Sequence, residues 1–124
     1  MNMEIFEHMQ AQELRKYIQF LLWHYRVMDS FWFIYVNDVF DQQTAENINA
    51  KVWKRVAGMA AKELVSTFNT KEKGLKGFVE AQKLFPWCIL IDYKIEERED
   101  EVIISVPSCP TQVARLKRGL DEFV

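Results

Sequence analysis

The stretch "YIQFLLWHYRVMDSFWFIYVNDVF", residues 17–40, decides the fold because it is the most apolar part of the chain. Five polar residues interrupt it, namely Gln19, His24, Arg26, Asp29 and Asn37. Interruptions this frequent argue against a membrane span. In its first half, residues at steps of three and four share one helical face: Tyr17, Phe20, Leu21, His24, Met28 and Phe31. The stretch therefore predicts a buried helix pair, whose first member runs from about Ala11 to Met28.

Two helix starts are expected further along the chain. Asp29 and Ser30 can accept hydrogen bonds from the free amides of a helix start, which favours a break there and a second helix over residues 31–40. The same residues are also compatible with a kink in one longer helix. Asp41 is a similar cap before a third helix, whose apolar residues step by four, four and three: Ile48, Val52, Val56 and Met59.

The second half of the chain changes from a helical period to a strand period. A shorter helix is indicated by Leu75, Phe78, Val79 and Phe85, and Pro86 should end it. Apolar residues then alternate with charged ones from Trp87 onward, at Ile89, Ile91, Tyr93 and Ile95. The alternation resumes after the charged tip "EERED", at Val102, Ile104 and Val106. Such a short connection predicts an antiparallel hairpin.

The final segment predicts one more helix. Its apolar stripe comprises Val113, Leu116, Leu120 and Phe123, and Pro110 suits the first helical position. With 124 residues, the chain is expected to form a single domain, residues 1–124. The predicted fold class is α+β, mainly helical, with about four largely antiparallel N-terminal helices, one antiparallel β-hairpin and a C-terminal helix that packs its stripe against them.

Composition narrows the function classes. A net charge of -2 argues against a general nucleic-acid binder, which needs a clustered positive field. Two cysteines are too few for a disulfide framework, and "MNMEIFEHMQ" lacks the features of a signal peptide. We therefore expect a cytoplasmic protein without a membrane partner. No His or Cys pair has metal-ligand spacing, and no phosphate-binding glycine loop occurs, so no metal or cofactor is expected.

Cys109 occupies a chemically unusual position. It would cap the final helix, where free amides and the positive end of the helix dipole stabilise a thiolate. That setting favours nucleophilic chemistry, although a lone cysteine there is more often only a small capping residue. Cys88 would lie in the first strand. His24 is more often a core histidine than a base or ligand, and Trp32 and Trp53 fit either a core or the wall of a ligand pocket.

Two segments carry a family resemblance. "CPTQVARLKRGLDEF", residues 109–123, resembles the signature of a family of uncharacterised prokaryotic proteins distantly similar to L-2-amino-thiazoline-4-carboxylic acid hydrolases. The matching residues are Cys109, Arg115, Gly119, Leu120 and Phe123. "DSFWFIYVNDVFDQQTAENINAKVW", residues 29–53, resembles the N-terminal region of that family, at Asp29, Trp32, Phe33, Phe40, Ala45, Val52 and Trp53. The chain departs from the family pattern at Asn37 and Asp41, and the resemblance implies a continuation beyond Val124 with another cysteine.

Two classes of function follow. The first is a small-molecule binding or sensor domain with an aromatic-lined pocket, ligand-binding residues His24, Trp32 and Trp53, and Cys109 at its mouth. The second is a cysteine-dependent hydrolase of a small C–N or C–S substrate. Its catalytic residues would be Cys109 as nucleophile and Arg115, which would orient a substrate carboxylate.

A homodimer is also expected. The last helix shows no evident stop, because Gly119 comes early and the chain ends on apolar residues. Its partner surface would lie near Phe31 and Phe33, with Phe123 as a further candidate.

Overall fold

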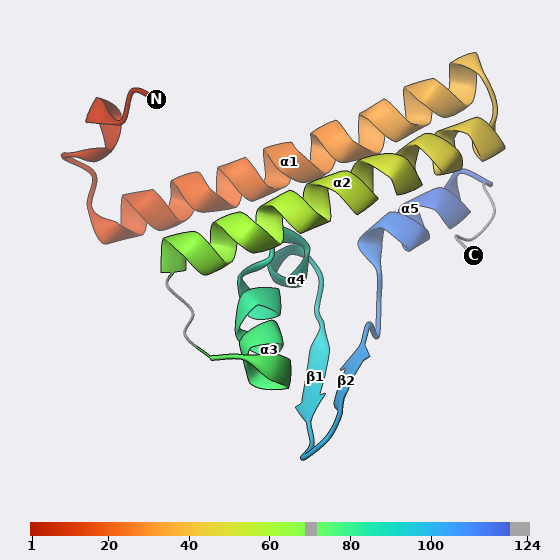
Figure 1. The fold of residues 1–124 in the computed structure, drawn as a ribbon. Helices are drawn as coiled ribbons and strands as arrows, with labels where there is room; N and C mark the ends of the chain where they lie inside the picture. Colours follow the sequence, from red (N-terminus) through yellow and green to blue (C-terminus); the bar gives the residue numbers. More distant parts are fainter. Residues whose placement is uncertain (69–71, 120–124) are drawn as a thin grey trace. The chain divides into compact units, whose positions relative to one another are not determined.

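The computed structural model describes residues 1–68 and 72–119, which form two compact units, Met1–Glu46 and Asn47–Val124. The fold is mainly helical α+β with a two-stranded antiparallel hairpin and a C-terminal helix, which confirms the predicted class. In chain order the elements are η1 (Glu4–Phe6), α1 (Ala11–Val39), α2 (Gln42–Phe68), α3 (Gly74–Leu84), α4 (Pro86–Leu90), β1 (Lys94–Glu97), β2 (Val102–Ser105) and α5 (Pro110–Lys117) (Figure 1).

The long helix α1 is continuous, so the predicted break at residues 29 and 30 is wrong. The Ser30 hydroxyl donates a hydrogen bond to the Arg26 carbonyl oxygen one turn earlier, at 2.8 Å. A serine bonded in this way leaves the helical backbone intact and does not cap a new helix. The start at Ala11 agrees with the prediction, and a capping box fixes it, with the Gln10 amide donating to the Glu13 carboxylate at 2.8 Å.

The apolar face predicted to be buried on α1 is the exposed one. Phe20, Leu21 and Phe31 are exposed, and Met28 is 58% exposed, whereas Phe33, outside the predicted stripe, is only 8% exposed. Apolar residues surround most of this helix, so its periodicity did not identify a unique buried face. The buried ring of Phe33 also removes it from the partner surface predicted around Phe31 and Phe33.

Asp41 caps α2, as the sequence predicts. Its carboxylate accepts a hydrogen bond from the Thr44 backbone amide at 2.6 Å, and α2 begins at Gln42. This bond lowers the pKa of the Asp41 carboxyl below its ordinary value, because the amide dipole stabilises the charged form.

We expect Asp41→Ala to lower the thermal unfolding midpoint at neutral pH and to leave it little changed at very low pH. A carboxyl whose pKa is lowered by folding contributes stability above its unfolded pKa, and that contribution is lost as the pH falls through the folded pKa. Calorimetric scans between neutral pH and about pH 2 would measure it. Asp41→Asn, which caps without titrating, is the control, and an equal deficit for Asp41→Ala at every pH would contradict the account.

The face of α2 in the second unit also differs from the prediction. Val52, Val56 and Met59 are exposed, and the half-buried residues include Trp53 and Leu64, which lie on a different face. The shift is large, because even adjacent positions such as Val52 and Trp53 are about 100° apart around a helix. The identity of the buried face determines which side chains of α2 can form a site.

Pro86 both ends one helix and begins another. It stands at the first position of α4 (Pro86–Leu90), so the strand predicted from Trp87 onward is wrong over this segment, and Cys88 lies on a helix. Proline is favoured at the first helical position because its missing amide has no partner there. The first strand, β1, begins only at Lys94, three residues after the buried Ile91.

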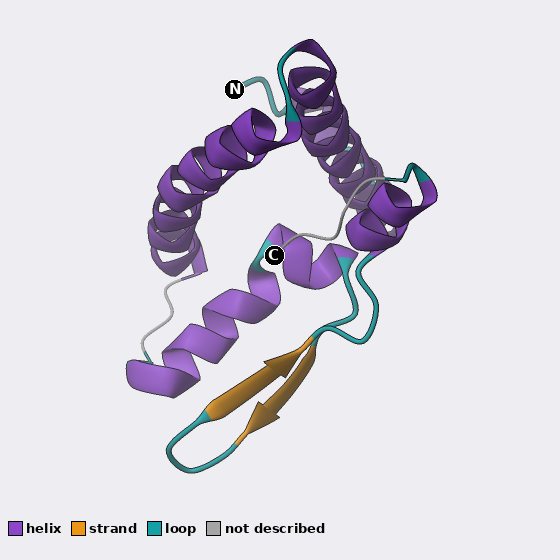
Figure 2. Cartoon of the chain, turned by 90° about the vertical axis from the view of Figure 1, so that its right-hand side faces the viewer, coloured by secondary structure: helices purple, strands orange, loops and turns teal. Residues whose placement is uncertain are grey.

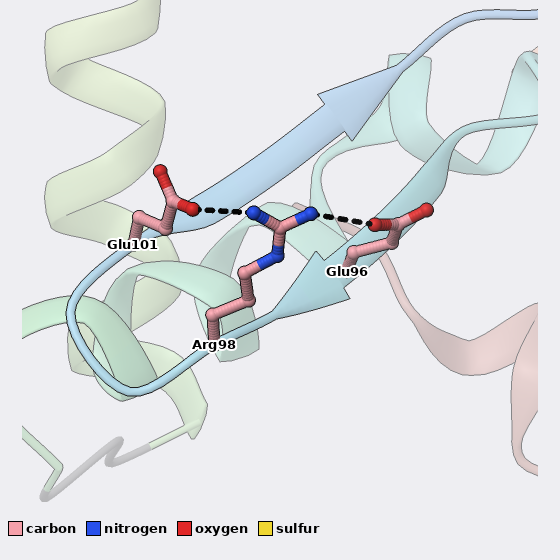
Figure 3. Close-up of polar contacts among 3 residues, drawn as sticks. All are labelled: Glu96, Arg98 and Glu101. Carbon is pink, nitrogen blue, oxygen red and sulfur yellow. Dashed lines mark hydrogen bonds and ion pairs between the residues drawn. The ribbon is translucent and has the colours of Figure 1, made fainter.

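The hairpin has a definite register, although its turn lacks an Asn-Gly signal. Its two strands run antiparallel (Figure 2). Ile95 pairs with Ile104, and Glu97 pairs with Val102. At the tip the Arg98 amide donates to the Glu101 carbonyl at 2.9 Å, and the Arg98 guanidinium lies between Glu101 at 2.6 Å and Glu96 at 3.7 Å (Figure 3). These side chains are exposed, so the ion pairs add little stability and the tip is solvated, as expected.

The glycines of α2 and α3 provide a matched test of packing. A methyl group at Gly77 would overlap the Glu72 carbonyl oxygen, whereas a methyl group at Gly58 would meet nothing within 4 Å. We expect Gly58→Ala to stabilise the protein by about 0.5–1 kcal/mol through helix propensity, and Gly77→Ala to destabilise it by about 1–3 kcal/mol. Urea unfolding followed by circular dichroism would measure both. Stabilisation by both variants would refute the close approach at Gly77.

The last described helix begins as predicted and ends earlier than predicted. Cys109 is the N-cap residue of α5, and Pro110 is its first helical residue. Gly119 adopts a φ of 71°, and its amide donates to the Leu116 carbonyl, so this glycine ends the helix, and the expectation of a helix without a stop is wrong. Val113 and Leu116 are exposed, and Arg115 is buried, so the predicted packing of the Val113 stripe is wrong. Leu120 and Phe123 lie outside the described residues.

Candidate functional site

An open groove of about 420 Å³ lies in the second unit. Four of its lining residues come from α2: Trp53, Ala57, Ala61 and Leu64. Four come from α3 and the residue that follows it: Phe78, Ala81, Gln82 and Phe85. Trp87 of α4 and Tyr93, which precedes β1, complete the lining. The volume falls within the range typical of small-molecule sites.

The spacing of the α2 residues explains the shape of the groove. Residues 53, 57, 61 and 64 are separated by four, four and three positions, so they lie on one helical face. Two of the four are alanines, which leave space where larger side chains would fill it. Trp53 was predicted from the sequence, but Ala57 and Ala61 were not, although their four-residue spacing from Trp53 places them on the same helical face.

Aromatic rings make up half of the groove lining. The Trp53 and Trp87 rings meet edge to face, with centroids 6.1 Å apart and an interplanar angle of 68°. Such pairs contribute stability beyond their buried area and hold both rings in a fixed orientation. The other aromatic members are Phe78, Phe85 and Tyr93.

None of the described residues that line the groove carries a charged side chain, and the hydrogen-bonding side chains of the lining include Gln82 and Tyr93. Burial raises the pKa of the Tyr93 phenol, and the nearby thiolates of Cys88 and Cys109 raise it further. Tyr93 therefore stays protonated at neutral pH and can donate a hydrogen bond. The sequence pattern predicted Tyr93 only as a strand residue, and its place in the groove lining was not predicted.

The two thiols lie in different environments. Cys88, in α4, is half-buried, and this burial raises its pKa, with a partial offset from the positive charge of Lys83. Cys109 is also half-buried and free, and it stands at the N-cap of α5 without a side-chain capping bond.

We expect Cys109 to react with iodoacetamide faster than Cys88 at pH 7. The thiolate is the reactive form, and the raised pKa of Cys88 reduces the fraction of that side chain present as thiolate. Rates measured from pH 6 to 10 on the single-thiol variants Cys88→Ser and Cys109→Ser would show the order. Faster labelling of Cys88 in the folded protein would remove the activated-thiolate hypothesis.

Of the predicted site residues, Trp53 lines the groove, and Trp32 and His24 do not. Both belong to α1 in the first unit. His24 is exposed, with its ring stacked on Phe20 at a centroid distance of 6.0 Å, so the expected core histidine is a surface residue. Arg115 is only 5% exposed, although it was predicted to meet a substrate.

Over residues 1–68 and 72–119, no group of three or more His, Cys, Asp or Glu side chains is arranged to hold a metal ion. Within the same part of the chain, no helix combines the length and apolar character needed to cross a bilayer.

The fold and groove define a small, mainly helical α+β protein with an uncharged aromatic site. The chain belongs to a family of unknown function, DUF6125, whose model matches residues 8–124. No curated protein and no solved structure matches it.

Proposed function

We propose that the protein binds a flat, largely apolar small molecule in the groove between α2, α3 and α4. The observation that carries this proposal is the lining: its described residues include five aromatic side chains and no charged one, around a volume of about 420 Å³. Aromatic walls favour planar ligands, which stack on them or meet their edges. The absence of a cation among the described lining residues disfavours phosphates and nucleotides as ligands.

The polar groups of the groove suggest how the ligand is oriented. The protonated Tyr93 hydroxyl can donate to a ligand carbonyl or ring nitrogen, and the Gln82 amide can both donate and accept. A neutral heteroaromatic compound with one such group fits this combination. Few, well-placed polar groups in an apolar lining are the usual basis of orientation in small-molecule sites.

A fluorescence titration with the neutral aromatic probe N-phenyl-1-naphthylamine tests the proposal. Ala61→Phe should fill the groove and weaken probe binding at least about tenfold. Ala50→Phe is the matched control, because both alanines are exposed residues of α2 and Ala50 is not in the lining. Absence of saturable binding to the wild-type protein, or equal binding by Ala61→Phe, would refute the proposal.

A second candidate is a cysteine-dependent hydrolase similar to L-2-amino-thiazoline-4-carboxylic acid hydrolases. The observation that favours it is the position of Tyr93, which lines the groove and lies within electrostatic reach of Cys109. The Cys109 thiolate would attack the carbon of a C–N or C–S bond, and Tyr93 would protonate the departing nitrogen or sulfur. Water would then hydrolyse the covalent intermediate, release the product and regenerate the thiol.

The hydrolase candidate is tested separately, by turnover of a substrate. Turnover of a thiazoline carboxylate should be lost in Cys109→Ser and kept in Cys88→Ser. Arg115 would have to meet the substrate carboxylate from a buried position, which makes its role the weakest part of this candidate. Probe binding without turnover would leave the binding function in place and exclude the hydrolase.

A further inference from the structure

An apolar face of α1 remains exposed along most of the helix. Its members are Tyr17, Leu21, His24, Met28, Phe31 and Tyr35, separated by four, three, four, three and four residues, and we call them the heptad face. This is the spacing of a coiled-coil seam. Leu21, Met28 and Phe31 are exposed, and Tyr35 is 62% exposed.

The heptad face and the exposed apolar residues beside it form a large surface patch. Its exposed aromatic rings and the adjacent Phe20 present roughly 300 Å², since an aromatic side chain carries about 150–250 Å². Exposed Leu21, Met28 and the neighbouring Ile18 extend the patch to on the order of 600 Å², the upper end for a monomer. Two such patches together give roughly 1,200 Å², which reaches the size of a specific interface.

We propose that the heptad face is the interface of a homodimer in which α1 pairs with α1 of a second copy in antiparallel orientation. The spacing of the heptad face is symmetric about residue 26, so it is the same in both chain directions. A two-fold axis at this position places Leu21 opposite the partner's Phe31 and His24 opposite the partner's Met28. Tyr17 then faces the partner's Tyr35. Over 29 residues the paired helices would run side by side for about 44 Å.

The helix dipoles and the position of Asp38 favour the antiparallel direction. Asp38 lies three residues after Tyr35, so it continues the heptad spacing near the C-terminal end of α1. Antiparallel pairing aligns the helix dipoles favourably. Parallel pairing would place Asp38 beside its own copy.

A lipid surface is the other class of partner for an apolar helix face. Helices that lie on membranes carry a Lys- and Arg-rich polar face. The residues of α1 outside the heptad face include Arg15, Lys16 and Arg26, together with Glu13, Asp29 and Asp38, so its charged residues carry no net positive excess. A second copy therefore fits this helix better.

Sedimentation equilibrium of the full chain over roughly 1–100 µM tests the proposal. The wild-type protein should be a dimer, and Leu21→Lys or Phe31→Glu should each raise the dimer Kd at least about tenfold. Mixing the two variants in equal amounts should restore dimerisation, because the antiparallel register places the new lysine opposite the partner's new glutamate. Trp23→Glu, an exposed α1 position outside the heptad face, should leave the Kd unchanged.

Three outcomes would contradict the proposed dimer, its interface or its antiparallel register. A wild-type protein that stays monomeric throughout this range would exclude the dimer. Pelleting of that monomer with phosphatidylglycerol vesicles would identify a lipid surface as the partner instead. Undiminished dimerisation of both single variants would place the interface elsewhere. Failure of the mixture to associate, with both variants helical by circular dichroism, would exclude the antiparallel register.

Discussion

Val79→Asp should unfold the second unit at 25 °C or reduce its free energy of unfolding by about 4 kcal/mol or more. Val79 is 2% exposed in α3, and it is the largest of the fully buried side chains among the described residues. A carboxyl group there would lose its hydration and would also remove the apolar contacts of valine. Since small domains have only about 5–15 kcal/mol of stability, one such change is a large part of the total.

A control on the same helix separates burial from helix effects. Leu75 is 44% exposed and lies one turn before Val79, so Leu75→Asp introduces the same charge at a solvated position of α3. Its effect should stay within about 1 kcal/mol. Urea unfolding curves followed by circular dichroism would compare the two variants, and equal losses would show that Val79 is not a core residue.

Trp53→Ala should lower the free energy of unfolding by about 2–3 kcal/mol, somewhat less than the loss typical of a fully buried tryptophan. The ring is half-buried, it meets Trp87 edge to face, and it forms part of the groove wall. The substitution removes the aromatic pair and enlarges the groove, so binding of N-phenyl-1-naphthylamine should also weaken in the folded variant.

The comparison for Trp53 is Trp23, an exposed tryptophan of α1. Trp23→Ala should change the free energy of unfolding by less than about 1 kcal/mol and leave probe binding unchanged. Chemical denaturation and probe titration of both variants would give the answer. A Trp53→Ala variant that keeps full stability and loses only binding would make Trp53 a ligand residue without a structural role.

Short-range signals in the sequence determined the helix boundaries that were predicted correctly. The capping bond of Asp41, the start of α1 at Ala11 and Pro110 after Cys109 depend on residues within one turn of each other. Local hydrogen bonds and fixed backbone angles act the same way whatever the rest of the chain does. The hairpin was predicted for the same reason, because so short a connection permits only antiparallel pairing.

Other local signals had two possible outcomes, and the sequence alone did not separate them. Ser30 could cap a new helix or bond back to Arg26, and it does the latter. Pro86 could end a helix and begin a strand, or begin another helix, and α4 shows the second outcome. Gly119 came earlier than the expected end of α5, yet its positive φ ends the helix there.

The buried faces and the groove depend on tertiary structure. The stripes predicted on α1, α2 and α5 are exposed at Met28, Val52 and Leu116, while Phe33 and Arg115 are buried. Periodicity states that a helix has an apolar face, but a helix with apolar residues around most of its surface offers several, and the packing partner selects one. The groove joins Trp53 to Tyr93, residues far apart in the sequence, and only the folded chain brings them together.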